Sequence, residues 1–326
     1  MSYTRAMVIW CLVGAMAVPT VASFALTGLT VDLHSNPSLL LSISGILAFS
    51  FFYRYWRPNP HLRALTEVAA QFLLILIFGL LLTYAAVAVK FPYVDAGLHA
   101  IDNALGFNRQ AYLKFFADRP WLSRTVEFAY FSMLPQFALV PVVMFFAKKF
   151  ERVQRMTIAV AIALLITILV SVFTPSLTAF VHVDMPEMAS VPANLYTPEA
   201  TMEALRAGTI RSTALNQLEG LISFPSFHTA AALIFIWTLH TVRYVGWAGI
   251  PLNLALIVAT PTVGAHYFID VVGGTVVAFA AIAASHLGAD AQKRTSSQSF
   301  LLDSSQIWLS PPVPRSGCSS SIELRR

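Results

Sequence analysis

Two histidines and one aspartate stand at the edges of membrane-length apolar runs, where a membrane protein has little reason to keep them unless it uses them. His228 lies in the stretch Phe-Pro-Ser-Phe-His-Thr, and His266 lies in Gly-Ala-His-Tyr-Phe-Ile-Asp, which ends at Asp270. Imidazole can act near neutral pH as a nucleophile or as an acid and base. The three residues together indicate phosphoryl transfer through a histidine nucleophile at a membrane surface.

The spacing of His266 and Asp270 fits a nucleophile and the group that orients it. Residues four apart share one face of a helix, with Cβ atoms roughly 6 Å apart. A carboxylate at that distance can accept the Nδ1–H of the imidazole, which fixes the tautomer and leaves Nε2 free to attack. It would also stabilise the cation that forms after attack, as in a catalytic triad. Such pairs also arise by chance, so the spacing alone does not establish the role.

Ser226 and His228 open the apolar run 229–239, and Pro225 before them is typical of a helix start. The free N–H groups and the positive dipole end of such a helix favour a phosphate, to which Ser226 can add a hydroxyl donor. His228 is then placed to protonate the leaving oxygen and later to deprotonate the attacking one. A lone histidine at a helix end is more often a cap or a surface residue.

The two motifs resemble signature motifs of the type 2 phosphatidic acid phosphatase superfamily. In that family Pro-Ser-x-His and His-x-x-x-Asp are the second and third motifs, and the resemblance covers roughly residues 66–288. It implies a six-helix phosphatase-like core with His266 as nucleophile, Asp270 as its orienting group and His228 as acid and base. It also implies that Ser226 binds the phosphate.

The first motif of that family is only partly present. It usually reads Lys-x6-Arg-Pro; here Arg119 precedes a proline, Tyr112 stands at the lysine position, and Lys114 is the nearest lysine. Arg119 and Lys114 are therefore candidates to contact the phosphate, although solvated or snorkelling cations are the alternative. Arg211, at the end of a short helix predicted over 197–211, is a further candidate.

The third motif also departs from the phosphatases. They have Ser-Arg ahead of the histidine, where this chain has Ala259 and Thr260, and Phe227 replaces a glycine of the second motif. A degenerate first motif and a missing third-motif arginine are more similar to the sphingolipid-synthase branch, which includes inositol-phosphorylceramide synthase. The run Ala-His-Tyr-Phe-Ile-Asp-Val at 265–271 is similar to the fourth motif of that branch. The resemblance thus implies an inositolphosphotransferase-like member.

The composition is that of a polytopic membrane protein. The 326 residues are 57% hydrophobic and 11% charged, with a mean hydropathy of +0.68; soluble domains carry about 25% charged residues. At about 20 residues a span, there is room for roughly eight helices. The net charge of +5 fits basic cytoplasmic loops better than nucleic-acid binding. Two cysteines do not make a disulfide framework.

We expect an all-α, polytopic membrane helix bundle of about eight transmembrane helices. Two of them belong to an N-terminal segment, residues 1–65; residues 66–288 form the phosphatidic acid phosphatase-like catalytic core, and 289–326 a disordered cytoplasmic tail. The expected spans are 6–28, 38–54, 66–89, 125–147, 155–173, 228–244, 247–263 and 267–288.

The charges of the loops predict the orientation of the bundle. Arginines and lysines concentrate between expected spans two and three, four and five, and six and seven, and in the tail. The positive-inside rule places these segments and both chain ends in the cytoplasm. The remaining loops, which carry both histidine motifs and Arg119, then face the periplasm or lumen. We expect a multi-pass protein, of a bacterial inner membrane.

The prediction is an integral membrane phosphotransferase that acts on a lipid-linked phosphate through a phosphohistidine on His266 and passes a phospho-head group to a lipid alcohol. No cofactor or metal is expected, since cations and N–H groups can stabilise the charge. A lipid phosphate phosphatase, acting on phosphatidic acid or a polyprenyl pyrophosphate, differs only in using water as acceptor. A non-catalytic transporter or scaffold, indifferent to loss of His266, is the second alternative. The donor lipid and the oligomeric state stay open.

Overall fold

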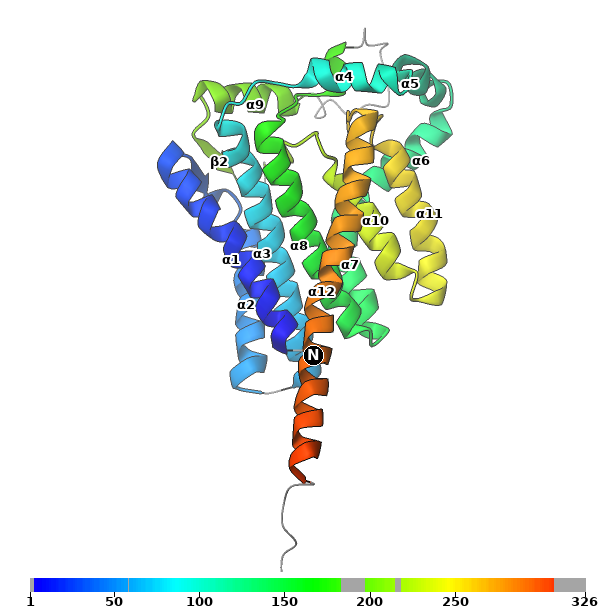
Figure 1. Ribbon diagram of the computed structural model, residues 1–326. Helices are drawn as coiled ribbons and strands as arrows, with labels where there is room; N and C mark the ends of the chain where they lie inside the picture. Colours follow the sequence, from blue (N-terminus) through cyan, green and yellow to red (C-terminus); the bar gives the residue numbers. More distant parts are fainter. Residues whose placement is uncertain (1–2, 58, 183–196, 215–217, 308–326) are drawn as a thin grey trace, which may run out of the picture. The chain divides into compact units, whose positions relative to one another are not determined.

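The structure is a computed structural model that describes residues 3–57, 59–182, 197–214 and 218–307. The chain divides into two units, Met1–Ser285 and His286–Arg326, and the description concerns the first. In chain order the elements are α1 (Tyr3–Thr27), β1 (Thr30–Asp32), η1 (Leu33–Ser35), α2 (Pro37–Tyr55), α3 (Pro60–Ala88), α4 (Asp95–Ala104), α5 (Arg109–Ala117), α6 (Pro120–Phe131), α7 (Met133–Phe146), α8 (Phe150–Phe173), η2 (Ala179–His182), α9 (Thr197–Ala207), β2 (Ser212–Ala214), α10 (Phe227–Leu239), α11 (Arg243–Ala259) and α12 (Phe268–Ile307) (Figure 1).

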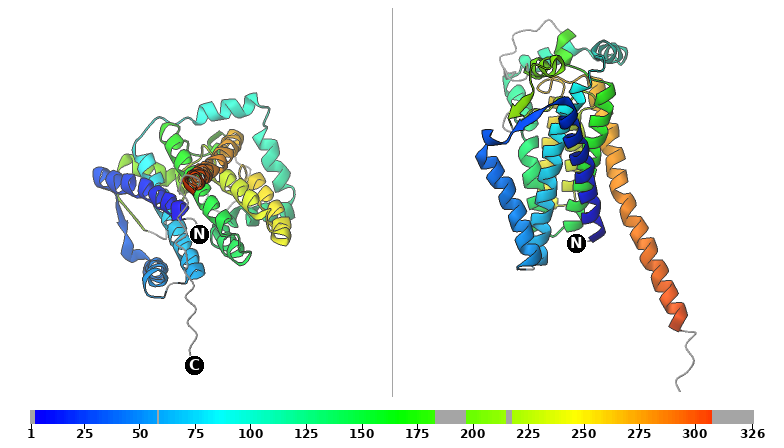
Figure 2. Two further views of the ribbon diagram at one scale, coloured as in Figure 1. Left: turned by 60° about the horizontal axis from the view of Figure 1, so that its bottom comes forward. Right: turned by 90° about the vertical axis from the view of Figure 1, so that its left-hand side faces the viewer.

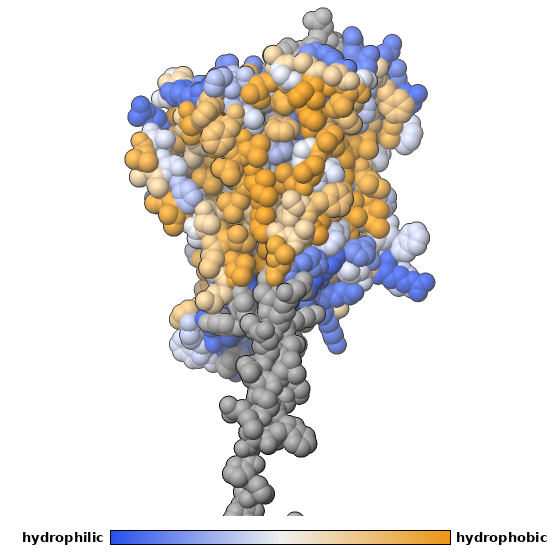
Figure 3. Space-filling view, in the orientation of Figure 1, coloured by the Kyte–Doolittle hydropathy of each residue, from blue (hydrophilic) through white to orange (hydrophobic). Residues whose placement is uncertain are grey.

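Long apolar helices dominate the described residues, as the composition predicts for a membrane protein. Among those residues, four helices are long and apolar enough to cross a membrane, and a fifth span results if the bent pair α6 and α7 counts as one. The helices α2, α10 and α11 are apolar but shorter. Hydrophobic residues cover the middle of the face shown in Figure 3, with hydrophilic residues toward both ends. The mostly helical membrane fold is confirmed; eight spans and a six-helix core stay predictions.

Two segments differ from the expected spans. The helix expected over 125–147 is broken at Ser132, where α6 and α7 meet at a bend of 58°. Pro135 explains the break, because it has no N–H to donate to the carbonyl of Phe131. At the other end of the chain, α12 continues to Ile307 instead of ending near 288. Residues 308–326 of the expected tail lie outside the described residues.

The packing of small residues brings the helices of the core together. The largest apolar core joins side chains of α3, α7, α8, α10 and α12. Small side chains allow close approach of helix backbones in membranes. The fully buried alanines of this core include Ala159, Ala163, Ala230, Ala231, Ala278 and Ala281. Helices α1 and α2 lie outside this core and each packs against α3 (Figure 2).

The expected outer loop at 90–124 forms two helices that cross one end of the bundle. These are α4 and α5, shown at the top of Figure 1, with α9 at the same end. The strands β1 and β2 form a short parallel pair, Thr30 opposite Ser212, between α1 and the segment after α9. The same end of the bundle holds the loops that carry both histidine motifs, so α4 and α5 are placed to contact those loops.

Candidate active site

The structure brings the two histidine motifs together. The Nδ1 atom of His266 lies 3.1 Å from Oδ2 of Asp270. The rings of His266 and His228 are 5.7 Å apart between centroids and are inclined by 66°. His266 is 3% exposed and Asp270 is 0% exposed. The pair of imidazoles and the carboxylate therefore form one compact group at the start of α10 and α12.

The His266–Asp270 pair forms across a loop–helix junction and not along one helix face, as the spacing had suggested. Helix α12 begins at Phe268, so His266 precedes it. Ala265 has a left-handed backbone with φ of 53°, and the amide of His266 donates to the carbonyl of Thr260 at 3.3 Å. The loop thus folds back, and the imidazole reaches the first turn of α12.

Asp270 is held by several donors in addition to the imidazole. Its Oδ2 accepts hydrogen bonds from the hydroxyl of Ser223 at 2.6 Å and from the amide of Tyr267 at 2.9 Å. Its backbone carbonyl accepts the amide of Ser226 at 3.0 Å, which ties α12 to the start of α10. A carboxylate in this network is a natural acceptor for the Nδ1–H of His266, so the network favours the tautomer with the proton on Nδ1 and leaves Nε2 without one.

A glycine permits the close approach of α10 and α12. A Cβ on Gly274 would lie 2.3 Å from the carbonyl oxygen of Ser226 and 3.0 Å from Cβ of Thr229. Backbone clashes of this size cannot be relieved by a side-chain rotation. Gly274 is therefore needed for the contact that sets Asp270 beside the first turn of α10.

Two buried acids on α4 position the His266 loop. Asp102, which is 2% exposed, accepts the amides of Phe268 and Ile269, each at 2.9 Å. It thus caps the N-terminus of α12 from another helix, where a negative charge is stabilised by the helix dipole. Asp95, seven residues earlier on the same face of α4, accepts a hydrogen bond from the hydroxyl of Tyr267 at 3.0 Å.

Arg109 on α5 braces the same loop. Its guanidinium is 6% exposed, pairs with Asp102 at 3.2 Å, and donates to the backbone carbonyl of His266 at 2.9 Å. Burial lowers the pKa of Arg109, and the neighbouring carboxylate of Asp102 acts in the opposite direction. An ion pair this buried is stable only when its remaining groups find partners, and the carbonyl of His266 is one of them.

The loop after α8 closes the other side of the His266 loop. The hydroxyl of Ser176 donates to Asp95 at 2.7 Å, and the amide of Ala179 donates to the carbonyl of Ala265 at 2.8 Å. Burial, together with Asp95, raises the pKa of Tyr267, so this phenol stays protonated as a donor. Ala265 and Tyr267, the two neighbours of His266 in the chain, are thereby both held in place.

His228 is positioned by the bend between α6 and α7. The ring of Tyr130, two residues before Ser132, stacks on the His228 imidazole at 4.4 Å with an angle of 16°. A Cβ on Gly264 would lie 2.8 Å from both the Tyr130 ring and Cδ2 of His266. Gly264 therefore allows Tyr130 and His266 to pack closely beside His228.

The structure places Ser226 in this cluster, but as a helix cap. Its side chain is 0% exposed, and its Oγ accepts the amide of Thr229 at 3.3 Å. The proline before it and the apolar run after it therefore start α10 as the sequence predicts. The hydroxyl oxygen is directed to the helix's own backbone in this conformation.

The three predicted cations lie elsewhere. Arg119 is the N-cap residue of α6; its guanidinium stacks over Phe115 at 4.2 Å and donates to the carbonyl of Phe115. Lys114 is exposed on α5, and Arg211 is exposed next to β1, whose Thr30 amide bonds to its carbonyl. Among the residues described, no hydrogen bond or ion pair joins these cations to the histidines or Asp270.

Sequence reasoning missed several residues that build the site. Asp95 and Asp102 carried one usable signal, because two acids seven residues apart lie on the same face of a helix. Arg109, Ser223 and Tyr130 carried none, since the residues of the histidine motifs that they contact come from distant parts of the chain. The Arg109 bond to His266, for example, joins residues 157 positions apart.

Comparison with known proteins agrees with this geometry. A family model described as the PAP2 superfamily matches residues 96–284, more than half of the chain, and the match includes both histidine motifs, α5 and all of α4 except its first residue. No curated protein and no solved structure matches the chain. Members of the superfamily are generally phosphatases or phosphotransferases. The chain therefore belongs to the PAP2 superfamily.

Proposed function

We propose that the protein is a membrane phosphotransferase that acts on lipid-linked phosphates through a phosphohistidine on His266. The observation that carries the proposal is the group formed by His266, Asp270 and His228. A carboxylate lies 3.1 Å from Nδ1 of His266, and a second imidazole lies 5.7 Å away between ring centroids. Such an arrangement supports a nucleophile, an orienting group and a proton carrier in one site.

In the proposed reaction, Nε2 of His266 attacks the phosphorus atom of the donor. The bond from phosphorus to the leaving lipid alcohol breaks, and protonated His228 gives its proton to that oxygen. In the second step His228 removes the proton of an acceptor hydroxyl, whose oxygen attacks phosphorus and breaks the phosphorus–nitrogen bond. Asp270 stabilises the positive imidazole of His266 in both steps through its hydrogen bond to Nδ1.

The start of α10 supports binding of the phosphate beside His228. The first intrahelical bond of α10 runs from the amide of Ala230 to the carbonyl of Ser226. The amides of Phe227 and His228 therefore precede the regular bonding of the helix and lie at its positive dipole end. We propose that this end meets the phosphate, with Arg119, Lys114 or Arg211 contributing a cation only after a side-chain rearrangement.

Burial of the site favours a lipid alcohol over water as acceptor. His266 is 3% exposed, and the Tyr130 ring covers His228. Exclusion of water protects a reactive intermediate from hydrolysis until the proper acceptor arrives. Together with the similarity of the 265–271 run to the sphingolipid-synthase branch, this supports an inositolphosphotransferase-like reaction. Hydrolysis by water is the second candidate, which the superfamily assignment supports equally.

The two ends of α8 support the expected orientation. The loop after its last residue bonds to the His266 loop, while the basic residues from Lys148 to Arg155 lie at its start. We propose, from the positive-inside rule, that the histidines face the periplasm or lumen and the basic end the cytoplasm.

Turnover by the purified protein in detergent tests the proposal. Phosphatidylinositol is supplied with and without a lipid alcohol, for the wild type, His266→Ala and His240→Ala. His240 is an exposed histidine at the far end of α10 and serves as the matched control. Product that requires the lipid alcohol and vanishes only in His266→Ala is expected. Release of inositol phosphate without an acceptor would identify a hydrolase, and equal activity of wild type and His266→Ala would contradict the histidine mechanism.

A further inference from the structure

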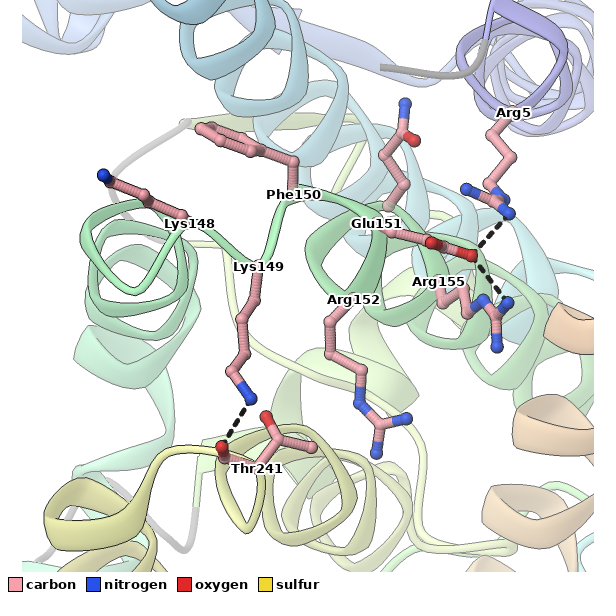
Figure 4. Close-up of a pocket in the computed structure, with 9 residues that line it drawn as sticks. Arg5, Lys148, Lys149, Phe150, Glu151, Arg152, Arg155 and Thr241 are labelled. Atoms are coloured by element: carbon pink, nitrogen blue, oxygen red, sulfur yellow. Dashed lines mark hydrogen bonds and ion pairs between the residues drawn. The ribbon is translucent and has the colours of Figure 1, made fainter.

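A basic pocket lies at the end of α8 that is remote from the histidines. It has a volume of about 730 Å³ and is lined by α1, the turn from α7 into α8, and the turn after α10 (Figure 4). Helix α8 has 24 residues, so its two ends are about 36 Å apart at 1.5 Å per residue. The pocket is therefore separate from the site that the histidines form.

Cations outnumber carboxylates in this pocket by five to one. The lining includes one acid, Glu151, and it already pairs with Arg5 and with Arg155, each at 2.7 Å. The other lining cations are Lys148, Lys149 and Arg152. Figure 4 shows Glu151 between the two arginines and the Lys149 side chain running to Thr241. The pocket thus keeps a positive charge that its own acid does not neutralise.

Two of these cations are held in place by backbone carbonyls and not by acids. The Nζ of Lys149 donates to the carbonyl of Thr241 at 2.6 Å. Arg152 donates to the carbonyl of Trp237, and its guanidinium stacks over the Trp237 ring at 3.5 Å. Neutral partners fix the position of a cation without cancelling its charge, so both remain able to attract an anion.

A buried amide without a hydrogen-bond partner suits this pocket to a polar ligand. Gln154 lines the pocket and is 1% exposed, yet neither its Oε1 nor its Nε2 has a hydrogen-bond partner in the described structure. The buried Nε of Arg152 is also without one. Leaving buried polar groups unsatisfied costs about 1–3 kcal/mol each. A polar ligand in the pocket can satisfy them.

An apolar crevice adjoins the pocket and shares Phe150 and Gln154 with it. Its remaining lining is apolar, including Leu65, Val68 and Phe145. The crevice has a volume of only about 10 Å³, so it can contact the side of a hydrocarbon chain but cannot enclose one. A charged pocket that opens onto an apolar crevice at the end of membrane helices fits a lipid better than a soluble anion.

We propose that this pocket binds the phosphate of an anionic phospholipid headgroup from the membrane leaflet at that end of the bundle. The inference goes beyond the proposed reaction and does not depend on it. The lysine and arginine side chains contact the phosphate, the Gln154 amide bonds to the headgroup, and the first methylenes of a chain lie along the crevice.

Native mass spectrometry of the purified protein in detergent tests the proposal, with phosphatidylglycerol as the anionic probe and phosphatidylcholine as the zwitterionic one. Preferential retention of phosphatidylglycerol is expected. Lys148→Gln should weaken it about fivefold, the effect of one cation near an anionic lipid. Glu151→Gln should strengthen it, because Arg5 and Arg155 lose their carboxylate. Arg57→Gln, at the α2–α3 turn and outside the pocket, is the matched control for loss of one charge.

Lys148→Gln is expected to weaken lipid retention and Glu151→Gln to strengthen it. Misfolding would weaken retention in both variants, so the test distinguishes loss of the site from loss of the fold. Equal binding of the two lipids would overturn the proposal. So would equal effects of Lys148→Gln and Arg57→Gln. Thermal denaturation tests whether a soluble anion can replace the lipid. Inorganic phosphate should not stabilise the protein at concentrations at which phosphatidylglycerol does. Stabilisation by phosphate as large as that by the lipid would overturn the assignment to a membrane lipid.

Discussion

The two ends of α8 differ in the sign and the burial of the charges around them. At the histidine end, Asp95, Asp102 and Asp270 are buried, and each accepts several hydrogen bonds from neighbouring loops and helices. At the other end, cations outnumber the single acid, Glu151, which is exposed. Buried, paired charges fix positions, whereas unneutralised charges near the surface attract ligands. We therefore propose that the first end holds a nucleophile in a fixed position and that the second end receives an anion.

The largest effect is expected at Asp270. Asp270→Asn keeps the shape of the side chain but presents an amide to the imidazole, which favours the wrong tautomer of His266. Turnover should fall by about 10³- to 10⁴-fold, as for the equivalent change in a catalytic triad. Steady-state kinetics with the lipid donor measure it. A loss below tenfold in a folded variant would mean that the carboxylate does not orient His266.

The next effect compares one ion pair at each end. Asp102→Asn leaves the buried charge of Arg109 without its partner, and we expect a loss of about 3–5 kcal/mol in the free energy of unfolding. Glu151→Gln removes the acid of an exposed pair and should cost less than about 1 kcal/mol. Denaturation midpoints in detergent measure both.

A double variant sharpens that comparison. Asp102→Asn with Arg109→Gln should be less destabilised than the sum of the two single changes, since no buried charge is then left alone. Additive losses would contradict the coupling of Arg109 to Asp102. Equal losses from Asp102→Asn and Glu151→Gln would remove the difference between the two ends.

The sequence indicated which motif residues lie together better than it indicated the residues that hold them in place. His266, Asp270 and His228 followed from short motifs, because spacing and residue type are local properties. The break at Ser132 was not predicted, although Pro135 was visible, because a proline inside an apolar run often only kinks a helix. Arg109 and Asp102 act on residues more than 150 positions away, and no local pattern reports such contacts.

A smaller effect is expected at Gly264. Gly264→Ala places a Cβ 2.8 Å from the Thr260 carbonyl, from Tyr130 and from His266, so the loop must shift. Displacement of about 1 Å at a reacting group can cost about 100-fold in rate. Gly45→Ala is the control, because its Cβ would meet nothing within 4 Å on α2. Unchanged turnover of Gly264→Ala would show that the loop tolerates displacement.

The smallest effect concerns pH. Burial raises the pKa of Tyr112 from 10.0 to about 12, and its hydroxyl donates to the carbonyl of Val258. The folded state holds this proton more tightly than the unfolded state, so its stabilising effect is complete below pH 10 and is lost as the pH rises through about 12. The denaturation midpoints of wild type and Tyr112→Phe should therefore converge between these values. A difference between the two midpoints that stays constant over this pH range would contradict the raised pKa of Tyr112.

The most direct test of the histidine mechanism is to trap the intermediate. Phosphatidylinositol labelled with ³²P is mixed with the protein in the absence of a lipid alcohol, and the reaction is quenched with alkali, in which phosphohistidine survives. We predict label on the peptide that carries His266, and this label should be present in His240→Ala and absent in His266→Ala. Lipid alcohol added before the quench should release the label. Label that persists in His266→Ala, or turnover without any labelled protein under these conditions, would contradict His266 as the nucleophile.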